Sequence, residues 1–188
     1  MGDSSHALEV VGLSGSLRQG SFNAALLRAA KDAAPDCVQL DIATIRGIPL
    51  YDGDVEATGI PDIVKALKDR IAASDGLLLV TPEYNNSIPG VFKNAIDWLT
   101  RPAADIPRVF RNRPVALMGA TRGMGGTLLA QAAWLPILRT LGTKPWFGPR
   151  MTVSTAHTVF DSNGQLLDEA LRSQLRSFMT GFSAFIRG

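Results

Sequence analysis

Continuous apolar runs alternate with stretches of helical periodicity along most of this chain. The run at 76–80 is apolar at every position, which is typical of a strand covered on both faces of a parallel sheet. We therefore expect it to be a central strand. Further apolar strands are predicted at 8–13, 38–42, 114–119 and 151–154.

Helices are predicted between these strands from apolar residues at helical spacing. They cover 22–34, 63–71, 127–141 and 168–186, and another begins near Gly90. Repeated strand and helix alternation within 188 residues predicts one α/β domain spanning the whole chain, 1–188. The preferred topology is a flavodoxin-like, doubly wound, five-stranded parallel sheet of order 2-1-3-4-5 with helices on both faces.

A polar loop follows the central strand. Pro82 and Pro89 cannot donate backbone hydrogen bonds and bias their preceding residues away from helix, so 81–88 is predicted to be ordered and extended. Open α/β sheets bind ligands just outside the carboxyl ends of their strands, where this loop lies. The polar and aromatic side chains available there are Glu83, Tyr84, Asn85, Asn86 and Ser87.

The loop after the first strand, within GLSGSLRQGSFN at 12–23, combines glycines with hydrogen-bond donors. Hydroxyls, one guanidinium and the free N–H groups of a helix start together suit a terminal phosphate. The dinucleotide pattern GxGxxG, the P-loop GK[ST] and the hydrolase pattern GxSxG are all absent. The alternative is that Ser21 is an ordinary helix cap and Arg18 is solvated.

Composition narrows the classes of function. A formal charge of +2 without a concentrated basic face argues against nucleic acid as a partner. A single cysteine excludes an internal disulfide, and the lack of Cys and His clusters argues against structural zinc. Neither a leader-type segment nor a membrane-length apolar run is present, so we expect a cytoplasmic protein without membrane contacts.

Two segments, GSLRQGSFN at 15–23 and PEYNNSIPGVFKNAIDW at 82–98, together resemble the NADPH-dependent FMN reductase family, in its branch of quinone, azo-dye and chromate reductases. The resemblance covers nearly the whole domain. It implies FMN as the cofactor and NADH or NADPH as the co-substrate. The implied electron acceptor is a small molecule, either a quinone, an azo dye or chromate.

The resemblance also implies three groups of cofactor-binding residues. The FMN phosphate is expected near Ser16, Arg18, Ser21, Phe22 and Asn23. The isoalloxazine is expected along Pro82, Glu83, Tyr84, Asn85 and Ser87, partly through backbone atoms. A third flavin loop is expected at Thr121, Arg122, Gly123, Met124, Gly125 and Gly126.

The chain shows no persuasive catalytic constellation of its own, so the flavin is expected to carry the chemistry in a ping-pong exchange. Tyr84, Lys93 and Arg101 are candidate contacts for substrate or NAD(P)H. The alternative for Arg101 is a solvated basic loop, and that alternative is favoured for Arg108, Arg111 and Arg113. Glu83 is interpreted as structural rather than as a proton donor, since a lone carboxylate is a weak acid–base signal.

The predicted helix at 127–141 is apolar around more than one stripe. One side is expected to pack on the sheet and the other on a second subunit, unless Pro136 bends the helix over a single core. The family resemblance also implies a homodimer or homotetramer. Two rival functions remain: a flavodoxin-like electron carrier that serves a protein partner, and a non-catalytic phosphate-binding module.

Overall fold

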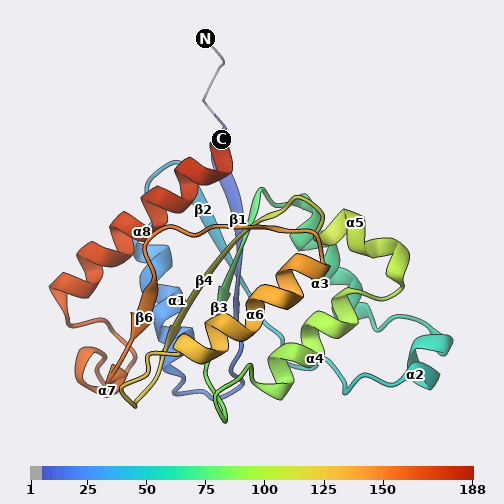
Figure 1. Ribbon diagram of the computed structural model, residues 1–188, viewed down its shortest axis with the longest axis horizontal. Helices are drawn as coiled ribbons and strands as arrows, with labels where there is room; N and C mark the ends of the chain where they lie inside the picture. Colours follow the sequence, from blue (N-terminus) through green and yellow to red (C-terminus); the bar gives the residue numbers. More distant parts are fainter. Residues whose placement is uncertain (1–5) are drawn as a thin grey trace.

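The computed structural model, which describes residues 6–188, shows a parallel sheet between two layers of helices (Figure 1). Residues 1–5 of the predicted domain lie outside the described residues. The elements in chain order are β1 (Leu8–Ser14), α1 (Phe22–Ala33), β2 (Val38–Ala43), α2 (Gly53–Thr58), α3 (Asp62–Ala73), β3 (Gly76–Val80), α4 (Gly90–Leu99), η1 (Ala103–Asp105), α5 (Ile106–Val109), β4 (Pro114–Ala120), α6 (Leu128–Thr140), β5 (Lys144–Pro145), β6 (Met151–Val153), α7 (Ala156–Val159) and α8 (Glu169–Arg187).

The predicted strand order is confirmed. Parallel pairing places β1 between β2 and β3, and β3 between β1 and β4, so that the order is β2-β1-β3-β4-β5. The fifth position differs from the prediction because two short strands share it. β5 pairs with the first residues of β4, and β6 pairs with the last.

The division of the fifth position has a packing cause. Trp146, directly after β5, packs its indole against Phe178 and Phe182 of α8, with ring centroids 4.9 and 5.7 Å apart. The Trp146 N–H still donates to the Val115 carbonyl of β4 at 2.8 Å, and the chain leaves the sheet after this residue. It rejoins β4 only at Met151.

The central strand β3 separates two hydrophobic cores. Leu78 and Val80 belong to the core covered by α1 and α8, whereas Leu77 and Leu79 belong to the core covered by α3, α4 and α6. All four side chains are inaccessible to solvent. This alternation confirms that the uninterrupted apolar run is a strand buried on both faces.

Side chains cap the starts of α1 and α8. The Ser21 hydroxyl accepts from the N–H of Ala24 at 3.3 Å at the start of α1, and Asp168 Oδ1 accepts from Leu171 N at 2.7 Å at the start of α8. These contacts satisfy N–H groups that have no intrahelical partner. The short elements α2, η1, α5 and α7 were not predicted, because each has too few residues to show a hydrophobic period.

Across residues 6–188, no helix combines the length and the apolar character that crossing a bilayer requires.

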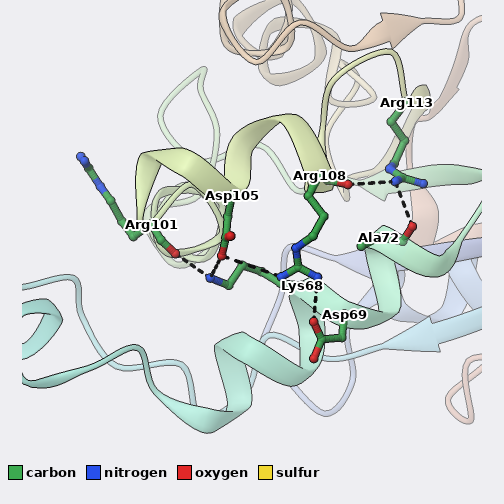
Figure 2. Close-up of polar contacts among 7 residues, drawn as sticks. All are labelled: Lys68, Asp69, Ala72, Arg101, Asp105, Arg108 and Arg113. Carbon is green, nitrogen blue, oxygen red and sulfur yellow. Dashed lines mark hydrogen bonds and ion pairs between the residues drawn. The ribbon is translucent and has the colours of Figure 1, made fainter.

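A buried ammonium group joins α3 to the segment after α4 (Figure 2). The Lys68 side chain is only 2% exposed. Its Nζ lies 2.6 Å from Asp105 Oδ2 and 2.6 Å from the carbonyl oxygen of Arg101. A buried charge is tolerated when it is paired and hydrogen-bonded, so these contacts fix η1 against α3.

Among the arginines that follow, Arg113 is less solvated than the sequence suggested, whereas Arg108 and Arg111 are exposed. Arg113 is half-buried and donates to the carbonyl oxygens of Val109 (2.7 Å), Ala72 (3.3 Å) and Ser74. Burial lowers the pKa of this guanidinium. Arg108 Nη1 lies 2.8 Å from Asp69 Oδ1, as Figure 2 shows. The expectation of a solvated basic loop is therefore wrong for Arg113, which is a structural tie.

Replacing Asp105 by Asn should leave the Lys68 ammonium without its carboxylate. We expect the free energy of unfolding to fall by about 2 kcal/mol, less than for a fully buried pair because the Asp105 side chain is 28% exposed. Urea denaturation at neutral pH measures the change. Asp69→Asn, which breaks the exposed pair with Arg108, is the matched control and should cost less than about 1 kcal/mol.

The same variant should change the pH dependence of stability. The hydrogen bond from Lys68 lowers the pKa of Asp105 from its ordinary 3.8, so the unfolded state binds this proton more readily. The stabilisation is complete above the ordinary pKa and is lost as the pH falls through the lowered folded value. Equal stability differences between wild type and Asp105→Asn at pH 7 and at pH values below 3.8 would contradict this account.

Candidate functional site

Three loops meet at one edge of the sheet, the lower edge in Figure 1. The first loop (15–21) follows β1, the second (81–89) follows β3 and the third (121–127) follows β4. Because β1, β3 and β4 are parallel neighbours, their carboxyl ends lie side by side. The three predicted groups of site residues are thus brought to the same edge.

The first loop is held close to α4. The Gly15 N–H donates to the carbonyl oxygen of Val80 at 2.9 Å, and a Cβ on Gly15 would lie 2.2 Å from the Phe92 ring. Only glycine allows this approach. Beyond it, Ser16 accepts from the Arg18 N–H at 3.3 Å, and the Arg18 side chain is exposed.

A buried hydroxyl without a partner indicates that this loop could bind a phosphate. Ser14 Oγ is shielded from solvent and has no hydrogen-bond partner among residues 6–188. Strand alternation places it on the same face as Leu8 and Val10, the face that α1 covers. A lone buried hydroxyl, an exposed guanidinium and the N-terminus of α1 form a donor set that fits an anionic phosphate.

Phe22, predicted with the phosphate group, packs its ring inward. The ring stacks on Phe160 with centroids 6.2 Å apart. Its backbone N–H belongs to the first turn of α1, where N–H groups lack intrahelical partners. Phe22 can therefore contribute a backbone donor at the site while its partly buried side chain packs against the core.

The tip of the second loop is a tight turn, so the prediction of an extended loop is wrong there. Tyr84 and Ser87 exchange two backbone hydrogen bonds of 3.0 Å, and Asn85 and Asn86 have φ of 50° and 62°. Left-handed values at both central positions define a type I′ turn, for which asparagine is well suited. The adjacent asparagines are the signal that could have identified the turn.

This turn decides which groups of the second loop can reach a ligand. The N–H groups of Tyr84 and Ser87 are used within the turn, which leaves them unable to serve as free donors. Pro82 is buried, and Tyr84 is 49% exposed. The exposed Tyr84 ring and the backbone beside Asn85 are the parts of the loop that a planar ligand can contact.

The Glu83 side chain turns toward the start of α6. Its Oε2 accepts from the N–H groups of Leu129 at 2.8 Å and Ala130 at 2.9 Å. Thr127 precedes α6 with φ of 70° and makes no side-chain capping bond. Glu83 therefore supplies the missing helix cap from another loop, which agrees with its interpretation as structural.

The third loop is fixed by the residues that follow β6. The Thr155 N–H donates to the Gly123 carbonyl at 3.0 Å, and Ser154 Oγ donates to the Met124 carbonyl at 2.7 Å. Gly126 has φ of 56°, and a Cβ there would lie 2.9 Å from Thr152. The loop is thus rigidly backed.

The third loop begins with a fixed residue, Thr121, and exposes the side chains at its tip. Thr121 Oγ1 accepts from the N–H of Gly123 at 3.3 Å, and the Thr121 N–H continues the pairing to Val153 at 2.9 Å. Arg122 and Met124 are exposed at its tip. The loop therefore offers an exposed tip on a fixed backbone.

Asn23, predicted at the phosphate, points its side chain toward β4. Its Nδ2 donates to the carbonyl oxygen of Ala120 at 2.8 Å, and its Oδ1 accepts from the Ala120 N–H at 2.9 Å. Both polar atoms of the carboxamide are used in this contact, which is buried. The side chain thus joins α1 to the beginning of the third loop.

The two cations predicted at the substrate side each have an acidic partner. Lys93 Nζ lies 2.7 Å from Asp97 on the same helix. Arg101 Nε lies 3.9 Å from Glu56 Oε2, and the Arg101 guanidinium carbon lies 5.3 Å from the centre of the Tyr51 ring. These contacts hold the Lys93 side chain along its own helix and the Arg101 side chain against Tyr51 and α2, and none of them is made with the three loops.

Comparison with known proteins gives a consistent picture. The profile of the NADPH-dependent FMN reductase family matches residues 8–158. An NAD(P)H-dependent FMN reductase of Pseudomonas aeruginosa is 40% identical over 180 residues, covering 96% of each chain. A quinone reductase of Escherichia coli K12 is 37% identical over 186 residues, covering 97% of each chain.

A solved structure agrees in fold. The flavoenzyme NAD(P)H:(acceptor) oxidoreductase FerB of Paracoccus denitrificans superposes with a TM-score of 0.86 at 34% identity. The match covers 96% of this chain and 97% of the FerB chain.

Removing the Glu83 carboxylate should loosen the start of α6. We expect Glu83→Ala to lower the free energy of unfolding by about 1 kcal/mol, the usual cost of losing a helix cap. Glu83→Gln should lose less, because the single amide oxygen can accept both N–H groups that now share Oε2. Urea denaturation of the ligand-free protein measures both changes. The interpretation fails if Gln is as costly as Ala.

Proposed function

Because the chain belongs to the NADPH-dependent FMN reductase family, we propose that it is an FMN-containing NAD(P)H oxidoreductase that reduces quinones. The observation that carries the proposal is the meeting of three loops at neighbouring strand ends. The first loop has the donor set for a phosphate. The second presents the aromatic ring of Tyr84, and the third presents glycines whose backbone is fixed by packing. An elongated ligand with a phosphate at one end and a planar ring at the other suits this arrangement.

Each loop receives a separate part of the proposed cofactor. Ser16, Arg18 and the N-terminus of α1 at Ser21 hold the phosphate, because they combine hydroxyls, a guanidinium and free N–H groups. The backbone from Pro82 to Asn85 and the Tyr84 ring line one part of the isoalloxazine. The loop 121–126 lines the remainder, where the exposed Gly123 permits close backbone approach and the buried Gly126 packs against Thr152.

Bound FMN would supply the redox chemistry by taking a hydride from NAD(P)H and passing two electrons to the acceptor. The net reaction converts NAD(P)H, a proton and a quinone into NAD(P)⁺ and a hydroquinone. Tyr84 and Met124 are exposed, which leaves an open face beside the loops. We propose that the nicotinamide and the quinone use this face in turn, which gives ping-pong kinetics.

An open face also bears on acceptor range. An open face does not select an acceptor by enclosing it, so we propose that the enzyme has broad specificity and also reduces azo dyes and chromate. Lys93 and Arg101 are 44% and 43% exposed, and their positive charge would attract anionic acceptors or the phosphates of NAD(P)H. A cytoplasmic location, where NAD(P)H is supplied and Cys37 stays reduced, belongs to the same proposal.

The purified protein should be yellow, with one FMN per chain, and anaerobic addition of NADH or NADPH should bleach the flavin absorbance. Subsequent addition of a quinone should restore it. Visible spectroscopy follows both steps. Bound flavin that neither nucleotide bleaches would indicate an electron carrier instead, and a protein without affinity for FMN would leave only a phosphate-binding module.

We also propose that α6 forms a subunit interface. Leu128, Leu129 and Leu135 are 42%, 49% and 40% exposed along this helix, and Phe147 is 77% exposed beside it. They border a groove of about 550 Å³ that continues to Trp146. A second copy of the chain would cover this apolar face, because clustered exposed apolar side chains commonly mark protein contacts.

The protein should therefore have the mass of a dimer or a tetramer in solution. Leu135→Arg combined with Phe147→Asp should shift it toward the monomer, because buried unpaired charge opposes association. Light scattering after gel filtration measures the mass. Leu167→Asp, a change at an exposed leucine outside α6, is the control and should leave the mass unaltered. A monomeric wild type would end this proposal.

A further inference from the structure

The carboxamide of Asn23 occupies a place where a strand would otherwise lie. β3 pairs with β4 as far as Val80 and Met118, and the Thr81 N–H then donates to the Met118 carbonyl at 2.9 Å. Backbone groups two residues apart in a strand point toward the same neighbour. The N–H and C=O of Ala120 therefore point to the side that β3 has just left.

β3 does not continue there, because it ends at Val80 and the second loop leaves the sheet after the bond from Thr81. Without a replacement, both backbone groups of Ala120 would be buried and unpaired, since Ala120 is 3% exposed. Asn23 satisfies both of them, with bonds of 2.8 and 2.9 Å, and is itself 5% exposed. One amide plane thus stands in for the missing strand residue.

This contact links the parts of the site that lie farthest apart in the sequence. Asn23 lies in the first turn of α1, two residues after the Ser21 cap, and its partner Ala120 lies 97 residues away, directly before the third loop. Building on the proposed function, we propose that Asn23 is a positioning residue. Its carboxamide replaces the hydrogen bonds that Ala120 loses where β3 and β4 separate. It thereby fixes the phosphate loop relative to the loop that lines the flavin ring.

The proposal differs from a direct phosphate contact, which the sequence resemblance implies for Asn23. A direct ligand acts on the phosphate alone. A positioning residue sets the spacing of the loops, so its loss must also weaken a ligand that has the ring without the phosphate. FMN and riboflavin form such a pair, because they differ only by the phosphate group.

The test compares the dissociation constants of FMN and riboflavin for apoprotein prepared from wild type, Asn23→Ala and Arg18→Ala, followed by quenching of flavin fluorescence. Asn23→Ala should weaken both flavins by a similar factor, on the order of tenfold, because two buried backbone groups lose their partners. Arg18→Ala, the matched phosphate-side variant, should weaken FMN by about tenfold and riboflavin by less than about twofold.

Amide exchange, resolved by NMR, gives a second readout in the ligand-free protein. The exchange rate of the Ala120 amide should rise in Asn23→Ala and should be unchanged in Arg18→Ala. Should Asn23→Ala fail to fold, Asn23→Gln keeps both the donor and the acceptor on a side chain that is one methylene longer, which displaces them from Ala120. It should weaken both flavins by similar factors, each smaller than the factor expected for alanine.

Three results would overturn the proposal. The first is a loss of FMN affinity alone in Asn23→Ala or Asn23→Gln, which would make Asn23 a phosphate ligand. The second is unchanged affinity for both flavins, and the third is unchanged exchange at Ala120. A wild type that binds neither flavin would refute the proposed function instead, and the exchange of the Ala120 amide would then decide the role of Asn23 by itself.

Discussion

The complete burial of β3 is the constraint on which the rest of the structure depends. Leu77 to Val80 have no exposed surface, so helices must cover both faces of the sheet and a parallel strand must lie on each side. Parallel neighbours place their carboxyl ends at a single edge. Polar residues that cannot enter either core are therefore gathered at that edge, and the loops after β1, β3 and β4 meet there.

At this edge the strands diverge, and side chains replace the hydrogen bonds that the sheet no longer provides. The carboxamide of Asn23 pairs with Ala120, and the carboxylate of Glu83 pairs with the first turn of α6. Ser154 secures the third loop from the opposite side. These contacts use the polar groups of the loops that face the protein, so few donors are left for a ligand. Among them are the exposed Arg18 and the buried Ser14 hydroxyl.

Hydrophobic periodicity predicted the strands and the long helices, because burial imposes those patterns locally. The alternation of strands and helices then led to the strand order. Periodicity missed features that depend on distant partners. The split fifth position follows from the packing of Trp146 on α8, and the orientation of Asn23 follows from a partner 97 residues away. The buried role of Arg113 likewise depends on carbonyl groups of α3. The turn at Asn85 and Asn86 was different, since its signal is local and was present in the sequence.

The interrupted outer position of the sheet has a consequence for the protein at high concentration. An exposed strand edge is a template on which another chain can add, and a long, flat edge invites fibrous aggregation. Here β5 has two residues and β6 has three, and the chain between them contains Pro149 and bends away from β4. An incoming strand would find no continuous row of backbone groups to pair with. The same aromatic packing that divides the fifth position thus protects the sheet from growing beyond it.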